Sequence, residues 1–162
     1  MNDGNKAADS EQRGLPFIRE DLFVQPSSAS EKPYLLGCKC SKCERVFFPK
    51  RSVCPDCLEE NTIKEIRLSR RGKLHTGTIA HAAPLGFSPP YAVGYVDLPE
   101  GVRIFTQIKD VEICKDFLKP GSEMLVPGTD MELVIERLRE DDEGRDVIGY
   151  KFTPVKEVDK KR

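Results

Sequence analysis

The sequence has no tryptophan and only two histidines, His75 and His81. No serine or cysteine nucleophile motif accompanies either histidine, and we interpret both as polar positions of a predicted strand. A G-x-G-x-x-G motif and a phosphate-binding P-loop are also missing. The sequence therefore predicts no catalytic residue of its own, and a self-sufficient hydrolase or transferase is disfavoured.

Long apolar runs are equally scarce. No stretch approaches the about 18 apolar residues that a membrane-spanning helix requires. The N-terminal residues 1–14 are polar and lack the apolar centre of a secretory signal. We therefore expect a cytoplasmic chain without a membrane anchor, in a compartment where cysteine thiols stay reduced.

An excess of charge of one sign is missing as well. Charged residues make up 33% of the chain, but they nearly cancel to a net charge of −1, which is not typical of a general polyanion binder. The exception is residues 64–83, where five basic residues accompany a single acid, Glu65. This stretch is either a solvated strand face or a site for an anionic ligand or an acidic partner surface. Its basic residues are Lys64, Arg67, Arg70, Arg71 and Lys73.

Cysteine is the residue type that the sequence does supply in a pattern: Cys40 and Cys43, then ten residues, then Cys54 and Cys57. Each C-x2-C turn places two thiolates on one side of a metal ion, and a hairpin over the ten residues brings the second pair round. Disulfides are disfavoured in a reducing compartment, and a redox C-x-x-C motif does not come twice at this spacing. We therefore expect zinc, although a rubredoxin-type iron centre uses the same ligands.

Four protein ligands leave no open coordination position, so the expected zinc ion is structural. Its binding free energy, roughly 10–16 kcal/mol in small zinc peptides, would supply most of the folding free energy of so small a module. Cys38 lies two residues before Cys40 and could compete for the metal. We assign Cys40 as the ligand because Cys40, and not Cys38, has the C-x2-C spacing to Cys43.

The pattern of the whole chain predicts a mostly β fold. From residue 64 onwards, β-branched and aromatic residues form about five substantial strands, and a short helix over Asp110–Leu118 follows the third of them. This succession is typical of a five-stranded OB-fold barrel, although strand counting alone does not separate it from other small barrels. The expected organisation is an N-terminal arm and linker (1–33), a zinc ribbon (34–63), the barrel (64–155) and a charged tail (156–162).

Several motifs in a fixed order carry a resemblance to a known family. They resemble a family that pairs a rubredoxin-like zinc ribbon with an OB-fold and was long known only as a domain of unknown function. The motifs lie within residues 34–155 and are Gly37–Cys43, Val46–Pro49, Cys54–Cys57, Arg71–Leu74, Gly86–Leu98, Glu100–Ile104, Lys119–Met124 and Tyr150–Pro154.

The resemblance implies a role in acyl-CoA chemistry. Members of the family are typically non-catalytic small subunits of thiolase-like acyltransferases, or of acyl-CoA hydratases and aldolases, and the large subunit supplies the catalytic cysteine and histidine. For this chain the resemblance implies a structural zinc ion and a hetero-oligomer with a thiolase-like subunit, which it stabilises. More narrowly, it implies a part in the breakdown of aromatic compounds such as toluene.

The resemblance also gives the basic stretch a possible ligand, because coenzyme A carries phosphates. A basic edge made of Arg67, Arg70, Arg71 and Lys73 is the candidate for binding the phosphates of a CoA thioester. The stiff apolar loop Phe87–Tyr91 is expected to contact the partner or to line the acyl tunnel.

A different function stays open, since OB-folds and zinc ribbons also bind single-stranded nucleic acid. That function needs a basic groove with stacking aromatic residues. The net charge of −1 and the acidic second half of the chain argue against it.

Overall fold

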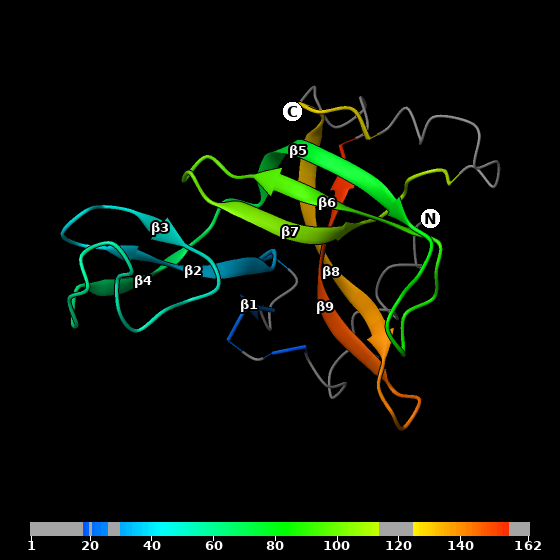
Figure 1. Ribbon diagram of the computed structural model, residues 1–162, viewed down its shortest axis with the longest axis horizontal. Helices are drawn as coiled ribbons and strands as arrows, with labels where there is room; N and C mark the ends of the chain where they lie inside the picture. The colour runs from blue at the N-terminus through cyan, green and yellow to red at the C-terminus, as the bar shows by residue number, and fades with distance from the viewer. Residues whose placement is uncertain (1–17, 20, 26–29, 114–124, 156–162) are drawn as a thin grey trace.

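The computed structural model describes residues 18–19, 21–25, 30–113 and 125–155. Most of the predicted helix over residues 110–118 lies outside these ranges, as do most of the N-terminal arm and the charged tail. Within the described ranges the chain forms nine strands, arranged as a small sheet beside a barrel (Figure 1). None of the helices in this part of the chain has the length and hydropathy needed to cross a membrane.

The small sheet is built around strand β2 (Tyr34–Cys40), which ends on the first predicted metal ligand. On one side β2 pairs with β1 (Phe23–Val24) and β3 (Val46–Phe47), and on the other side with β4 (Ile63–Arg67). All three pairings are antiparallel. Because β2 connects the arm to the cysteines, the position of the metal ligands depends on this one strand.

The barrel consists of the five strands that the alternating pattern predicts. They are β5 (Arg71–Ala80), β6 (Tyr91–Asp97), β7 (Arg103–Ile108), β8 (Asp130–Glu140) and β9 (Asp146–Pro154). Their order around the barrel is β5-β6-β7-β9-β8, closed by an antiparallel β5–β8 pairing and a parallel β7–β9 pairing. This is the topology of an OB-fold, and the predicted fold class is confirmed.

Side chains that alternate along β6 and β7 contribute to the barrel core. On β6 and β7 the even-numbered positions point inward and are buried, whereas Tyr95 and Phe105 point outward. Side chains from all five strands therefore meet inside the barrel. The most deeply buried of them are Leu74, Val96, Ile104, Met131, Leu133, Ile148 and Phe152.

The strand over residues 63–67 differs from the expectation. Its apolar alternation suggested a strand leading into the barrel, but it pairs with β2 from Cys40↔Ile63 to Leu36↔Arg67. Residue 64, the expected start of the barrel domain, therefore lies within a strand of the ribbon sheet. Alternation predicts that a segment is a strand, but it carries no information about which strand it pairs with.

The ribbon sheet and the barrel are joined by direct packing. The N-terminal arm contributes Leu22 and Phe23, each only 5% exposed, to the same apolar cluster as the barrel core. The rings of Phe48 and Tyr150 meet edge to face with their centroids 5.5 Å apart. Leu68, between β4 and β5, is buried and donates its backbone N–H to the carbonyl of Leu35 at 3.0 Å. Ribbon and barrel therefore share one apolar core.

Candidate metal centre

The structure brings together the four cysteines that the spacing singles out. The sulfur atoms of Cys40, Cys43, Cys54 and Cys57 all lie within 4.8 Å of one another, and the Cys43 and Cys54 sulfurs are 3.6 Å apart. Zinc–thiolate bonds of about 2.3 Å in a tetrahedron place sulfurs roughly 3.8 Å apart. The cluster therefore has the size of a tetrahedral thiolate site.

Two turns of the same design hold these sulfurs. In each turn the residue after the second cysteine adopts a left-handed backbone conformation, Glu44 with φ of 60° and Leu58 with φ of 54°. The first turn is closed by the Cys40 N–H bonding the Arg45 carbonyl at 2.9 Å, and the second by the Leu58 N–H bonding the Cys54 carbonyl at 2.8 Å. The repeated geometry points both pairs of thiols to a common centre.

The electrostatics of the cluster call for a cation. The backbone N–H of Cys43 and the hydroxyl of Thr62 lower the pKa of the Cys40 thiol to about 6. Hydrogen bonding with Cys43, together with burial, raises the pKa of Cys57 to about 12. Without a metal, a thiolate at Cys40 therefore opposes ionisation of its neighbours. A divalent cation removes that conflict, because it stabilises all four thiolates at once.

Ion pairs tie the two turns together around the cluster. Lys42 in the first turn pairs with Glu59 after the second, and Arg45 after the first turn pairs with Asp56 in the second at 2.6 Å. Both pairs are at the surface, so they orient the turns more than they stabilise them. The charged side chains surround the cluster, whose ligands are four sulfur atoms. Four sulfur ligands are a donor set that suits zinc.

Cys38 stays outside the cluster. Its side chain is buried in β2, and its sulfur accepts the backbone N–H of Arg51 at 3.3 Å. Cys114, the remaining cysteine, lies outside the described residues. Cys40, Cys43, Cys54 and Cys57 form the ligand set of a zinc ribbon.

The structure places the cations of the basic stretch in different surroundings. Arg67 lies over the ring of Tyr34, 3.8 Å from its centroid, on the ribbon sheet. Lys73 pairs with Asp130 at 2.6 Å. These two cations therefore already have close internal partners.

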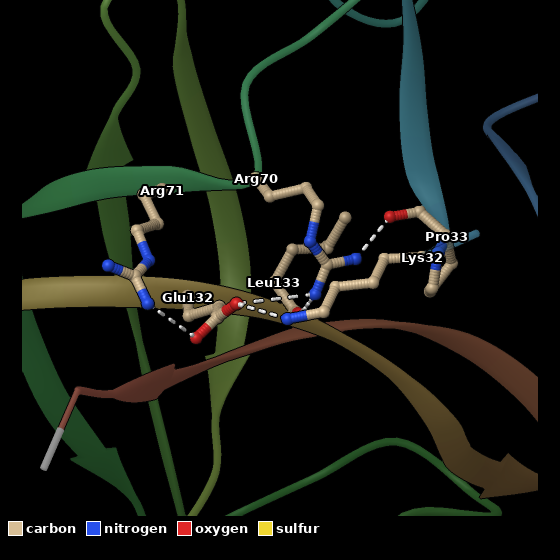
Figure 2. Close-up of polar contacts among 6 residues, drawn as sticks. All are labelled: Lys32, Pro33, Arg70, Arg71, Glu132 and Leu133. Carbon is tan, nitrogen blue, oxygen red and sulfur yellow. Dashed lines mark hydrogen bonds and ion pairs between the residues drawn. The ribbon is translucent and has the colours of Figure 1, made fainter. Parts of the chain in front are cut away.

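Arg70 and Arg71 meet instead at a carboxylate from β8, as Figure 2 shows. Arg70 contacts the Glu132 carboxylate at 3.5 Å and Arg71 contacts it at 3.4 Å. The Arg70 guanidinium also donates hydrogen bonds to the carbonyls of Pro33 and Leu133. Arg70 thereby joins the segment before β2 to the barrel strand β8.

Lys32 completes this group and was missed by sequence reasoning. Its ammonium lies 4.0 Å from the Glu132 carboxylate, although it is 38 residues from Arg70 in the chain. A lysine in a linker carries no signal of its own in the sequence. That Lys32 belongs to this group follows only from the structure, in which the pairing of β5 with β8 brings Glu132 to the end of the linker.

A separate apolar groove lies on the barrel and shares no lining residue with this group of charges. It encloses about 380 Å³, and all eleven residues that line it are uncharged. Phe87 and Tyr91 stack there with centroids 5.9 Å apart, and Phe105 and Tyr150 line it from β7 and β9. The loop expected to be apolar and stiff, Phe87–Tyr91, therefore forms one wall of a groove.

Comparison with known proteins gives a family. The zinc-ribbon segment, residues 29–62, matches the family described as ChsH2, rubredoxin-like zinc ribbon domain. The barrel, residues 65–136, matches the family described as ChsH2, C-terminal OB-fold domain. Both matches fall on the corresponding parts of the structure.

Whole-chain relatives agree with these matches. The chain is 36% identical to a DUF35 domain-containing scaffold protein of Methanocaldococcus jannaschii, over 88% of this chain and 98% of that one. It is also 36% identical to benzoylsuccinyl-CoA thiolase subunit BbsA of Thauera aromatica, over 87% of this chain and 90% of that one. The latter is a thiolase subunit, the kind of protein that the sequence resemblance implies.

A solved structure shares the fold. It is titled Ltp2-ChsH2(DUF35) aldolase and superposes with a TM-score of 0.50 at 25% identity, covering 75% of this chain and 84% of that one. Ribbon, barrel, metal ligands and relatives all agree. The chain belongs to the DUF35 family of zinc-ribbon and OB-fold proteins that includes ChsH2 and BbsA.

Proposed function

We propose that this chain is the non-catalytic, zinc-binding small subunit of a thiolase-type acyl-CoA-processing complex. It stabilises the catalytic subunit, which supplies the reacting residues, and the two form a hetero-oligomer in the cytoplasm. One observation carries the proposal: the match to a named thiolase subunit runs over 87% of this chain and 90% of the relative. The similarity therefore concerns the whole subunit and not one shared domain.

The zinc centre supports a structural role. Its four protein sulfurs leave no position open for a substrate, so the metal fixes the ribbon and takes no part in a reaction. Cys40 and Cys54 are buried, which anchors the metal in the body of the ribbon. The ribbon in turn shares a core with the barrel, so zinc binding stabilises the surface that the barrel presents.

The apolar groove supports a partner-binding role. Six large apolar side chains are exposed in the described part of the chain; two of them line the groove, and a third packs on one of these two with ring centroids 5.3 Å apart. Exposed apolar side chains gathered in one place are typical of protein interaction sites. Ile18 and Phe105 line the groove, and Tyr95 packs on Phe105.

Two finer statements belong to the proposal. The similarity to BbsA supports an aromatic acyl-CoA as substrate, of the kind formed in toluene degradation. A solved relative titled as an aldolase complex supports a second candidate, in which the catalytic partner is an acyl-CoA aldolase. The nucleic-acid alternative finds no support at the exposed aromatic pair Tyr95–Phe105, because the neighbouring cation Arg103 is paired with Asp97 at 2.6 Å.

Reconstitution tests the proposal. The full chain is produced together with a thiolase-like subunit from the same genome, and separately with an aldolase-like subunit. We expect a stable complex of fixed stoichiometry with the thiolase-like subunit, and CoA-dependent cleavage of a 3-oxoacyl-CoA only when both chains are present. A complex with the aldolase-like subunit alone would favour the second candidate. Activity of the small chain by itself would contradict both.

The groove allows a sharper test with a matched pair of variants. Phe105 and Val126 are each 55% exposed, but only Phe105 lines the groove. We expect Phe105→Asp to weaken assembly with the catalytic subunit at least about tenfold, because a charge would be buried without a partner. Val126→Asp should leave assembly unchanged. Equal effects of the two substitutions, measured by analytical ultracentrifugation, would remove the groove from the proposal.

A further inference from the structure

A cleft opens at the junction of ribbon and barrel, on the side where Arg70 and Arg71 meet Glu132 (Figure 2). It has a volume of about 570 Å³ and is lined by Lys32, Ser69, Arg70, Arg71, Pro99 and Glu132. We propose that this cleft binds the phosphate groups of a CoA thioester. The chemical class, a phosphate anion, follows from the cleft itself; its assignment to coenzyme A rests on the function proposed above.

The charge of the cleft is unbalanced. Three cations and one carboxylate line it, so two positive charges lack a counter-ion within the lining. Glu132 is shared among all three cations at 3.4–4.0 Å and holds none of them closely. Elsewhere on this barrel the Lys73–Asp130 ion pair is closer, at 2.6 Å. A phosphate entering the cleft would therefore find cations whose charge Glu132 does not cancel.

The geometry divides the cations into one fixed and two adjustable groups. Arg70 is held by the carbonyls of Pro33 and Leu133, so its guanidinium is already oriented. Arg71 and Lys32 are 55% and 72% exposed and have Glu132 as their only ion-pair partner in the described residues. They can turn toward a ligand at small cost. Guanidinium groups match the oxygen geometry of phosphate, and a lysine adds a mobile charge.

The remaining polar group of the lining is not needed for the ligand. Both donors of Ser69, its backbone N–H and its hydroxyl, are bound by Glu100. The ligand is therefore held by side-chain cations alone. Compared with the set expected from sequence, the proposed site leaves out Arg67 and Lys73, adds Lys32 and keeps Arg70 and Arg71.

A direct binding experiment with matched variants tests the cleft. The zinc-loaded full chain is titrated calorimetrically with coenzyme A and with pantetheine, which lacks the phosphates, at low and high salt. The double variant Lys32→Gln/Arg71→Gln removes the two adjustable charges. Lys73→Gln is the control, because Lys73 lies two residues along the same strand but is paired outside the cleft. Zinc content and circular dichroism check that each variant is folded.

We expect the double variant to bind coenzyme A about tenfold to a hundredfold more weakly, with a smaller salt dependence, and pantetheine as before. Lys73→Gln should stay within about twofold of wild type. Unchanged coenzyme A binding in the double variant would overturn the proposal, and so would an equal loss of binding in Lys73→Gln. The proposal would also fail if the chain alone does not bind coenzyme A and the double substitution does not change the affinity of the complex for coenzyme A.

Assembly with the thiolase-like subunit is measured in parallel to separate this inference from the proposed function. If the complex forms but the double substitution leaves the coenzyme A affinity unchanged, the inference fails and the proposed function stands. If the cleft binds coenzyme A but no catalytic subunit associates, the proposed function fails and the site stands. If the double variant loses assembly and keeps coenzyme A affinity, the cleft is a docking surface for an acidic partner and the inference is wrong.

Discussion

The carboxylate of Glu100 accepts two hydrogen bonds from Ser69, one from the backbone N–H and one from the hydroxyl, both at 2.7 Å. Both bonds end on the same oxygen, Oε1. Glu100 lies in the turn between β6 and β7, and Ser69 lies in the short link between β4 and β5. This contact therefore fastens a turn of the barrel to the segment through which the ribbon is attached.

We expect Glu100→Ala to destabilise the whole chain. The substitution leaves the Ser69 N–H without its acceptor, which costs about 1–3 kcal/mol for a group shielded from water. Glu100→Gln keeps an oxygen acceptor and should cost less. Urea denaturation of the zinc-loaded chain, followed by far-ultraviolet circular dichroism, measures both. An alanine variant as stable as wild type would show that water replaces the carboxylate without loss.

Arg70→Lys should also destabilise the junction, although it keeps the charge. The Arg70 guanidinium reaches the carbonyls of Pro33 and Leu133 together, and a single ammonium cannot reproduce that fork. We expect a loss of about 1–3 kcal/mol in the free energy of unfolding. Arg71→Lys is the matched control, since Arg71 makes one long contact at an exposed position. If the two lysine variants unfold at the same urea concentration, the Arg70 hydrogen bonds to Pro33 and Leu133 do not stabilise the junction.

Removal of a metal ligand should unfold the ribbon. Cys54→Ser takes one buried sulfur from the cluster, and we expect loss of stoichiometric zinc together with loss of most ribbon structure. Cys38→Ala removes a buried thiol outside the cluster and should retain one zinc per chain. Metal analysis and the thiolate-to-cobalt absorption band of the cobalt-substituted protein check both. Zinc loss in the Cys38 variant would contradict the ligand assignment.

Asp97 should titrate below the usual range of an aspartate. Hydrogen bonds from the Arg103 guanidinium, at 2.6 and 3.1 Å, lower the pKa of Asp97. Because its folded-state pKa lies below the unfolded value of about 3.9, the pair contributes stability above that pH. This contribution is lost as the pH falls through the depressed folded-state pKa.

Carbon-detected NMR titration of side-chain carboxyls measures this shift directly. In Arg103→Gln the pKa of Asp97 should rise toward the ordinary value. Asp141 serves as an internal control, because the backbone N–H and guanidinium of Arg145 lower its pKa independently of Arg103. An Asp97 pKa that stays the same in Arg103→Gln would mean that Arg103 does not pair with Asp97 in solution.

The metal site was predictable from sequence because it depends on local spacing. Two C-x2-C turns carry their geometry within four residues each, and the ten-residue spacer is long enough for a hairpin. The choice of Cys40 over Cys38 followed from the same spacing, and the structure has Cys40 in the cluster. The barrel strands were predictable for a related reason, since alternation such as that of β6 and β7 is a local signal.

The cleft and the groove were not predictable, because both are assembled from distant segments. Lys32 and Arg71 meet only through Glu132, some 60 residues further along the chain from Arg71. The groove combines side chains from the arm, the β5–β6 loop and all five barrel strands. Basic composition pointed to the stretch that contains Arg70 and Arg71, but it could not show that Lys73 pairs with Asp130 outside the cleft.

Strand β4 of the ribbon sheet has a consequence for how the molecule associates. In the described part of the chain β4 has β2 as its one hydrogen-bonded neighbour, so its other edge is available for a further strand. Lys64, Glu65 and Arg67 are exposed along it, and charged side chains on an edge oppose the addition of a strand from another molecule. The barrel, being closed, offers no such edge. Sheet extension at the β4 edge is therefore disfavoured, which protects this edge of the ribbon sheet from β-aggregation.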